Sequence, residues 1–451
     1  MANLSFIIVF LSIIVTTFNR GFLSFAGILI AVSVLFLLFI VYFYRNKINK
    51  DVSNSETLAL YSLVVSYSLF MFFSGGIYQT DFISSAILQF LPLFIFPVIL
   101  SYIVPQYNFQ AKDRRLRYVF LLLAALAFRI LIIIASPSPT IDVFTILKEA
   151  PMKVLSGLNP YNTHYSQVYA GVPSNYFAYW PVSFLLQIPF VALFGDPRLL
   201  FAILEIGSAL LIYLIGGRSI VSESLSLIYL FRPNSLFIVE QSWLVEMEFF
   251  FLVLTFYILS QKFSSRRIDK TIFGGLIFGL LVGIKPVYVV LYPFLFPLFK
   301  KVKKFFYASV AVILVTVSPF FIADPKIFFI QTIGGFFYSN KQNWWIPYPR
   351  AMSLNALYNV FYNRDIPFFV TIIVVLAVLV FLVKNLYAAI AGYKKNDEIL
   401  TAVLLSVAIF YSVFYILFRY TFINESYFVT DMIILWMASE AGNKKNKYRE
   451  K

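Results

Sequence analysis

The residues best suited to chemistry lie in one stretch, directly after an apolar segment that ends near Ala135. Asp142 begins a short amphipathic stretch, and Glu149 lies seven residues later, two helical turns along the same face. A Gly-Leu-Asn-Pro-Tyr turn follows at residues 157–161. A carboxylate where a membrane segment meets water is costly and rarely accidental. At such a boundary Asp142 can act as a general base that takes a proton from a hydroxyl group.

Asp142 also has a structural interpretation, because aspartate is a preferred N-cap and can simply cap the helix that follows. The two roles are compatible. Glu149 is expected either to orient the base or to bind a divalent cation together with Asp142. Its alternative is an ion pair with Lys148 or Lys153.

The composition is that of a membrane protein. Of the 451 residues, 61% are hydrophobic and 13% are charged, whereas soluble domains carry about 25% charged residues. Apolar runs long enough to cross a bilayer recur from end to end, which predicts an all-α polytopic membrane protein. The first of them lacks the features of a cleavable signal peptide. Because the chain has no Cys and a single His, disulfides and Cys-based metal sites are excluded, and a His-rich metal site is not expected.

The apolar runs predict about 14 membrane spans. Their approximate boundaries are 3–18, 21–44, 56–74, 82–104, 118–135, 198–216, 219–238, 246–261, 271–285, 286–300, 304–322, 366–385, 399–419 and 424–440. Every second connection between these spans is rich in Lys and Arg, and basic connections stay on the cytoplasmic side. Both termini are therefore predicted to be cytoplasmic. The formal charge of +15 follows from this topology, and no nucleic-acid partner is expected.

Two parts of the chain differ in their connections. Residues 1–110 are predicted to form an accessory block of four transmembrane helices, and residues 111–451 to form the catalytic module. In the second part the inner connections are short, while the outer connections 136–197 and 323–365 are long. Long loops on one face favour chemistry on that face.

The loop 136–197 is expected to carry short helices at the membrane interface. Its apolar positions from 142 to 155 approximate a helical stripe, which predicts an interfacial helix kinked at Pro151. Residues 179–195 are apolar but begin and end on the outer side. This pattern predicts a re-entrant or half-buried helix.

Several short motifs occur in one order on the predicted outer side. They are Asp142 after a span, Gly157 to Tyr161, Tyr179-Trp180-Pro181, Gly279 to Pro286, Ser353-Leu354-Asn355 and Asn424-Glu425-Ser426-Tyr427. With these motifs the chain resembles the GT-C superfamily of integral membrane glycosyltransferases. The resemblance is closest to the polyprenol-phosphate-mannose-dependent mannosyltransferases, and it excludes residues 1–110. Where that family tends to have Tyr-Pro-Pro, this chain has Tyr-Trp-Pro.

The resemblance implies a GT-C-like bundle and an inverting glycosyltransferase whose active site faces outside or the lumen. Its donor would be a polyprenyl- or dolichyl-phosphate hexose, mannose rather than glucose. Its acceptor would be a hydroxyl of a lipid-linked glycan or surface glycoconjugate. Asp142 takes the role of catalytic base by its match. The outer loops carry no Asp-x-Asp motif, so metal dependence is left open and no tightly held ion is expected.

The remaining expected site residues lie near the predicted outer surface. Lys285, Arg350, His164 and Arg419 are expected at the donor phosphate, and Glu246, Glu248, Tyr161, Trp344 and Glu425 at the acceptor or sugar. Structural alternatives are snorkelling of Lys285 to the headgroups, a solvated His164, and an interfacial aromatic belt around Trp344. Within the spans, Arg129 and Glu205 are expected to form a buried ion pair.

A polytopic lipid or glycolipid transporter, or flippase, is the alternative function. It would explain the many spans and the charges inside them. It also predicts an inverted repeat with paired broken helices at the midplane, and no convincing repeat is visible in the sequence. An inactive scaffold subunit is a third alternative, against which Asp142 argues.

Overall fold

The computed structural model describes residues 2–44, 55–73, 75–104, 111–170, 176–260, 269–298, 301–334, 351–393, 396–418 and 421–449. These residues are helical and form no strand; only an isolated bridge joins Phe22 to Ala351. The α-helices are α1 (Ala2–Val15), α2 (Phe25–Tyr44), α3 (Ser55–Phe73), α4 (Phe82–Leu100), α5 (Ala111–Ala135), α6 (Asp142–Leu155), α7 (Val182–Leu185), α8 (Ile188–Phe194), α9 (Arg198–Ile215), α10 (Ile220–Leu230), α11 (Ser235–Glu240), α12 (Val245–Leu259), α13 (Lys270–Val282), α14 (Tyr292–Leu295), α15 (Val302–Ala323), α16 (Pro325–Phe329), α18 (Leu354–Tyr362), α19 (Phe368–Ile390), α20 (Asn396–Leu417) and α21 (Ile423–Arg449). Four shorter helical segments are η1 (Asn19–Gly21), η2 (Pro286–Leu291), η3 (Phe296–Leu298) and η4 (Ile330–Gly334). The all-α prediction is confirmed for the described residues.

Within the described residues, eight helices are long and apolar enough to cross a membrane, so the chain is an integral membrane protein. They are α2, α3, α4, α5, α9, α15, α19 and α20. Several predicted spans are instead shorter apolar helices, among them α10 and α13. The run 219–238 is interrupted after α10 near Pro233, and the run 271–300 is interrupted at Pro286, because proline lacks the amide that would continue a helix. The expected number of about 14 spans counted these shorter segments as full ones.

The core lies around the last two helices. Helix α21 packs against α20, α1, α9, α10 and α12. In the most apolar window of α20, 83% of the residues are buried, against 11% in α15 and 17% in α19. Helices α15 and α19 therefore turn most of their apolar side chains outwards, as helices in contact with lipid do.

The first four helices share this core. Helix α1 packs against α21, α2 against α20, and α3 against α10. Most of their buried apolar side chains belong to the same hydrophobic cluster as those of the later helices, while Val15 and Ile28 form a smaller one with Met352. The predicted parts 1–110 and 111–451 are therefore joined by an extensive interface between helices.

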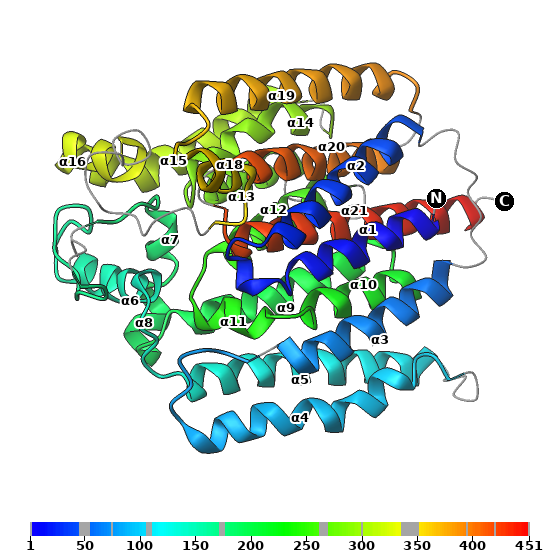
Figure 1. Cartoon of the computed structure of the whole chain (residues 1–451). Helices are drawn as coiled ribbons and strands as arrows, with labels where there is room; N and C mark the ends of the chain where they lie inside the picture. Colours follow the sequence, from blue (N-terminus) through cyan, green and yellow to red (C-terminus); the bar gives the residue numbers. More distant parts are fainter. Residues whose placement is uncertain are drawn as a thin grey trace.

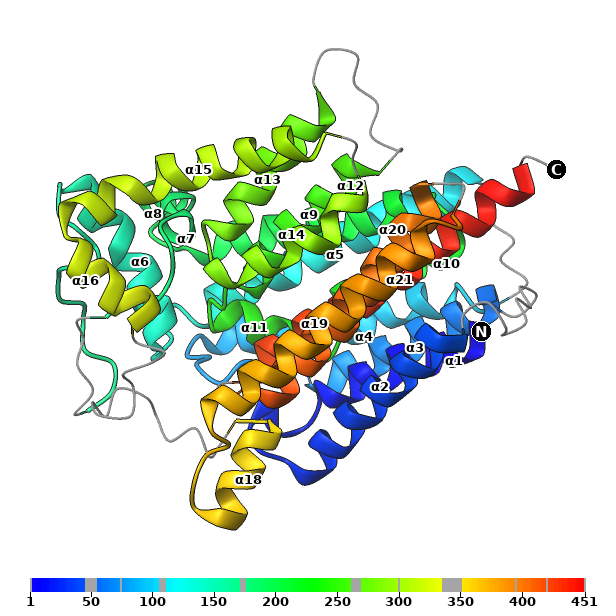
Figure 2. The same ribbon diagram turned by 90° about the horizontal axis from the view of Figure 1, so that it is seen from above.

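The two ends of the bundle are different. Figures 1 and 2 show both termini near one end and the short helices α6, α7, α8 and α16 at the opposite end, here named the loop end. The predicted interfacial helix is present as α6, which includes Pro151 within its length. The apolar segment 179–195 forms two short helices, α7 and α8, instead of one.

Helix α13 stops before its neighbour α15 does. The two helices begin side by side, because Lys304 near the start of α15 lies 3.3 Å from Asp269, which caps α13. Their backbones touch at two glycines: a Cβ added at Gly275 would lie 2.4 Å from the Phe305 carbonyl oxygen, and one at Gly279 would also meet the α15 backbone. The helices contain 13 and 22 residues. At about 1.5 Å per residue, α15 extends about 13 Å further towards the loop end.

Candidate functional site

Asp142 is the first residue of α6 and is half-buried at the loop end. Its carboxylate accepts hydrogen bonds from the Tyr176 hydroxyl and, at 2.9 Å, from the amide of Val143. Burial raises the pKa of the Asp142 carboxyl, while these hydrogen bonds counteract the rise. The N-cap of α6 is Ile141, and no side chain caps this helix, so the alternative that Asp142 acts as an N-cap is wrong. The contact with the Tyr176 hydroxyl leaves the chemical role open.

Further tyrosines surround Asp142. Tyr169 and Tyr179 from the same loop lie within electrostatic range of its carboxylate. So does Tyr78, which comes from the turn between α3 and α4. A carboxylate among phenols offers a proton acceptor beside aromatic faces and hydroxyl groups, a combination suited to a polar ligand with apolar faces.

The loop before α7 is attached to the break that follows α13. The Trp180 amide donates to the Ile284 carbonyl at 2.9 Å, and the Val182 amide donates to the Gly283 carbonyl at 3.0 Å. Gly283 has no space for a side chain, since a Cβ there would lie 2.4 Å from Cγ2 of Val182. This close packing holds the loop next to Lys285.

Lys285 is the cation of this region. Its Nζ lies 2.8 Å from Oε1 of Glu248 in α12 and 5.7 Å from the centre of the Tyr179 ring. Tyr288 donates a hydrogen bond to the other carboxylate oxygen of Glu248. Glu425, in the first turn of α21, interacts electrostatically with both Lys285 and Glu248. The Lys285 side chain is 25% exposed, so it is reachable from outside the protein.

Tyr179 lies between the surroundings of Asp142 and those of Lys285. Its phenol lies within electrostatic range of Asp142, Glu248 and Glu425, and its ring faces Lys285. Four residues expected from the sequence, in α6, in α12, after α13 and in α21, therefore surround one tyrosine. We call Asp142, Tyr176, Tyr179, Glu248, Lys285 and Glu425 the loop-end site.

Tyr161 is buried next to this site and holds Tyr179 in place. Its hydroxyl donates to the Tyr179 carbonyl at 2.8 Å, and its amide donates to Oδ1 of Asn159 at 3.0 Å. The ring packs against Phe177, Phe184, Phe320 and Phe328. Because Tyr161 is only 1% exposed, it is placed to orient Tyr179 and not to contact a sugar directly.

Glu149 binds the loop that follows α6. Its carboxylate accepts the Ser166 amide at 3.2 and 3.3 Å and lies 3.9 Å from Nζ of Lys153. The pair with Lys153 is one of the structural alternatives left open by the sequence. His164 is exposed on this loop. Among the residues that the structure describes, no group of three or more His, Asp or Glu side chains could hold a metal ion.

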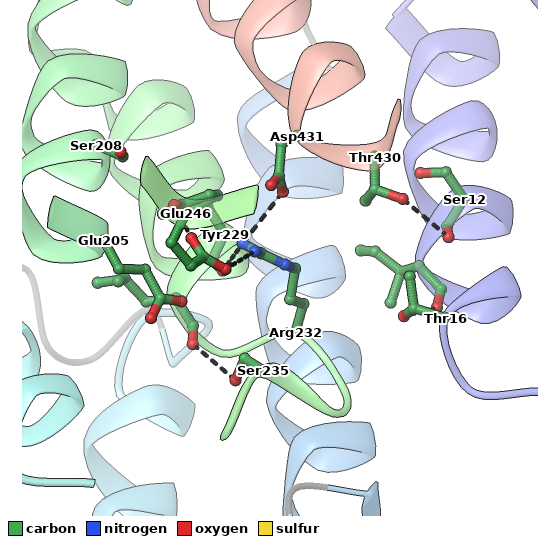
Figure 3. Close-up of polar contacts among 12 residues, drawn as sticks. Ser12, Thr16, Glu205, Ser208, Tyr229, Arg232, Ser235, Glu246, Thr430 and Asp431 are labelled. Carbon is green, nitrogen blue, oxygen red and sulfur yellow. Dashed lines mark hydrogen bonds and ion pairs between the residues drawn. The ribbon is translucent and has the colours of Figure 1, made fainter. Parts of the chain in front are cut away.

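Glu246 belongs to a separate network of buried charges (Figure 3). Arg232 lies 3.0 Å from Glu246 and 3.1 Å from Asp431, and Tyr229 donates to Glu246 at 2.7 Å. The side chains of both ion pairs are fully buried. Glu246 and Glu248 point to opposite sides of α12, because two residues turn a helix by about 200°. Only Glu248 therefore reaches the loop-end site.

The predicted ion pair between Arg129 and Glu205 is confirmed. The guanidinium donates to both carboxylate oxygens at 2.7 Å and to the Leu230 carbonyl at 2.6 Å. Both side chains are fully buried. A bidentate pair with a further hydrogen bond is the arrangement that makes buried charges tolerable.

Three expected site residues, Arg350, Trp344 and Arg419, lie outside the described residues. Sequence reasoning did not single out Tyr176 or Tyr78 as partners of Asp142. The run of aromatic residues after Tyr161 was a signal for the first, while nothing in the sequence connects Tyr78 to the loop. Comparisons of the chain with protein-family models, curated proteins and solved structures find no match.

Proposed function

We propose that the protein is an inverting membrane glycosyltransferase with a GT-C-like bundle of about 14 membrane segments, some of them shortened. It moves a hexose, mannose rather than glucose, from a polyprenyl- or dolichyl-phosphate donor to a hydroxyl of a lipid-linked glycan or surface glycoconjugate. One observation carries the proposal. A loop carboxylate bonded to a phenol and a partly exposed lysine flank the same tyrosine, Tyr179.

In the proposed reaction, Asp142 on one side of Tyr179 is the base, and Lys285 on the other side binds the leaving phosphate. The acceptor oxygen attacks the anomeric carbon and its proton passes to the carboxylate of Asp142. The bond from the anomeric carbon to the phosphate oxygen breaks, and its electron pair leaves with the polyprenyl phosphate. A single in-line displacement of this kind inverts the anomeric centre. A positioned general base contributes roughly 10²–10⁴-fold to such a reaction.

The leaving phosphate needs more cation than Lys285 alone provides. One of the three N–H groups of its ammonium can serve Glu248, at 2.8 Å, and two remain for a phosphate. Glu248 and Glu425 add negative charge beside it. Arg350 and Arg419 remain the expected additional cations.

The depth of Lys285 fits a donor held in the membrane. Lys285 is the third residue after α13, whose end lies about 13 Å short of the end of α15. The phosphate of a lipid-linked donor lies at the membrane interface, so a cation set back from the loop end can reach it. A soluble nucleotide sugar would bind from the water phase and does not require a cation at that depth. The sequence also carries no nucleotide-binding motif.

The expected orientation puts both termini in the cytoplasm and the loop-end site on the outer or luminal face. Two observations support it. The basic residues Lys301 and Lys304 lie beside the start of α13, about 20 Å of helix away from its break. The termini lie at the end of the bundle opposite α6 to α8 (Figures 1 and 2).

The proposal is tested by replacing the base. Asp142→Asn removes the proton acceptor and keeps the size of the side chain, so transfer is expected to fall by about 10²–10⁴-fold. The measurement is transfer of labelled hexose from a polyprenyl-phosphate hexose to membrane glycolipids in proteoliposomes. Glu149→Gln is the matched control on the same helix and is expected to keep most of the activity. Full transfer by a correctly inserted Asp142→Asn variant would reject the proposal.

A lipid or glycolipid transporter remains the second candidate, because one specific observation favours it. Two apolar runs are broken within the bundle, after α10 and after α13, and each break carries a cation, Arg232 and Lys285. Transporters build binding sites from such broken helices. A transporter would move the sugar lipid intact, so recovery of the donor with its phosphate–sugar bond unbroken on the opposite leaflet distinguishes it from a transferase.

A further inference from the structure

The turn between α3 and α4 is fixed by a buried carboxylate. Glu240, the last residue of α11, is fully buried. It accepts the amides of Ile77 at 2.7 Å and Tyr78 at 3.0 Å, and the hydroxyl of Ser136 at 2.5 Å. Gly76 is required for this approach, because a Cβ there would lie 2.0 Å from Oε1 of Glu240. The turn belongs to the first 110 residues, yet its position is set by the later part of the chain.

The same turn is also tied to the end of α5. The amides of Thr80 and Asp81 donate to the Ala135 carbonyl at 2.8 and 3.1 Å. Ala135 and Ser136 lead directly into the segment that ends at Asp142. Since Glu240 binds the turn and Ser136 together, these contacts hold the turn beside the start of the segment that ends at Asp142.

Tyr78 lies within electrostatic range of the carboxylate of Asp142. The side chain is half-buried. The pKa of its phenol is raised, first by burial and then by the nearby carboxylates of Glu240 and Asp142. Tyr169 lies within electrostatic range of both Asp142 and Tyr78. Lys285 contacts Glu248 and Tyr179, whereas the turn that carries Tyr78 is bonded to Glu240 and Ala135. The turn and Lys285 are therefore held by different parts of the chain.

We infer that the turn 75–81 forms the acceptor wall of the loop-end site, with Tyr78 as the side chain that contacts the sugar bearing the attacking hydroxyl. The inference rests on the proposed function and makes it more specific, since it names the part of the chain that binds the acceptor. A phenol provides an aromatic face for the C–H groups of a sugar ring and a hydroxyl for its oxygens. It also gives residues 1–110 a part in substrate selection.

The kinetic test distinguishes an effect on the acceptor KM from an effect on the donor KM. Farnesyl-phosphate mannose serves as donor and an alkyl mannoside as acceptor, both varied in proteoliposomes. Tyr78→Ala is expected to raise the acceptor KM about tenfold, the equivalent of about 1.4 kcal/mol, and to leave the donor KM within twofold. Tyr78→Phe, which keeps the ring, is expected to recover part of the loss. Ile83→Ala is the control, because Ile83 lies outside the turn, in α4, and its side chain is 69% exposed.

A second measurement tests the placement without sugar transfer. The chain has no Cys, so a Tyr78→Cys, Asp142→Cys pair is the only thiol pair present. A short bis-maleimide is expected to join it within the chain. The control pair Ile83→Cys, Asp142→Cys uses a residue of α4 that is 69% exposed and is expected to stay unjoined.

The outcomes are distinct. An acceptor KM that is unchanged in Tyr78→Ala, or a Tyr78–Asp142 pair that does not cross-link, overturns the acceptor wall and leaves the transferase proposal standing if Asp142→Asn is inactive. Full transfer by Asp142→Asn overturns both. A raised acceptor KM together with the cross-link supports the wall.

Discussion

The carboxylate of Asp142 is subject to two opposing effects. Burial disfavours its charged form and raises the pKa, whereas the hydrogen bonds from Tyr176 and the Val143 amide stabilise the charged form and lower it. The raised pKa makes Asp142 a stronger base than an exposed aspartate, provided that the pH keeps it ionised. Its partner Tyr176 therefore controls the pH range in which the site can work.

We predict that Tyr176→Phe moves the acid limb of the kcat/KM profile to higher pH. Loss of the phenol hydrogen bond raises the Asp142 pKa further, and activity disappears as the pH falls through that pKa. One hydrogen bond to a charged group corresponds to about one pH unit. Tyr165→Phe is the control, because the Tyr165 hydroxyl bonds the Pro160 carbonyl at 2.6 Å and no carboxylate. An unmoved acid limb would show that Tyr176 does not act on the base.

The charged members of the site could be found from the sequence, and its tyrosines could not. Asp142, Lys285 and Glu248 are conspicuous because charges at or inside membrane segments are rare. Tyr176 and Tyr78 are two of 30 tyrosines, and most such residues belong to apolar packing or interfacial belts. Only the folded chain shows which phenol reaches the carboxylate. Asp431, inside the predicted span 424–440, was an equally rare signal, and its pairing with Arg232 became visible only in the structure.

Among the elements, the break after α13 determines the geometry of the site. Pro286 predicts this break from the sequence. The apolar residues continue on both sides of the break, however, so hydropathy alone predicts two full spans at 271–300. Besides Pro286, the loop before α7 marks the end of α13, because its Trp180 and Val182 amides bind the carbonyls of Ile284 and Gly283.

We predict that Gly283→Ala displaces this loop. The new Cβ would meet Cγ2 of Val182 at 2.4 Å, and overpacking of this kind costs about 1–3 kcal/mol. Faster hydrogen exchange at the Trp180 and Val182 amides and a higher donor KM are the expected results. Adding Val182→Ala should restore both, because it removes the clashing atom. The control is Gly392→Ala, where an added Cβ would lie 3.6 Å from the Ala389 carbonyl oxygen, an ordinary contact. Normal exchange in Gly283→Ala would contradict the role given to this contact.

For the whole molecule, the sequence predicted the class of fold, while the number of about 14 spans stays a prediction. The period and length of the apolar runs determine that helices form and which of them can cross a membrane. They do not determine how the connections between helices are held, since that depends on side chains elsewhere. Glu240, for example, binds the 75–81 turn. The interface between residues 1–110 and the later helices could not be predicted from the sequence either. An apolar surface that faces lipid and one that faces another helix have a similar composition.

We predict that the two ends of the bundle face opposite sides of the membrane. Single cysteines can be placed in a chain that has none, at exposed Ser156 after α6 and exposed Lys303 at the start of α15. In intact cells an impermeant maleimide should label Ser156→Cys and leave Lys303→Cys unlabelled, and after permeabilisation both should react. The reverse pattern would put the loop-end site in the cytoplasm and contradict the proposed orientation.

The unequal lengths of α13 and α15 also affect the surrounding lipid. A bilayer adapts its thickness to the hydrophobic length of the helices that it contacts. Where a short helix meets a long one, headgroups on that side are drawn inwards, and the leaflet becomes locally thin and curved. The protein would then deform the membrane beside α13, and the proposed polyprenyl donor, a long isoprenoid that disturbs lipid packing, would gather there before it is bound.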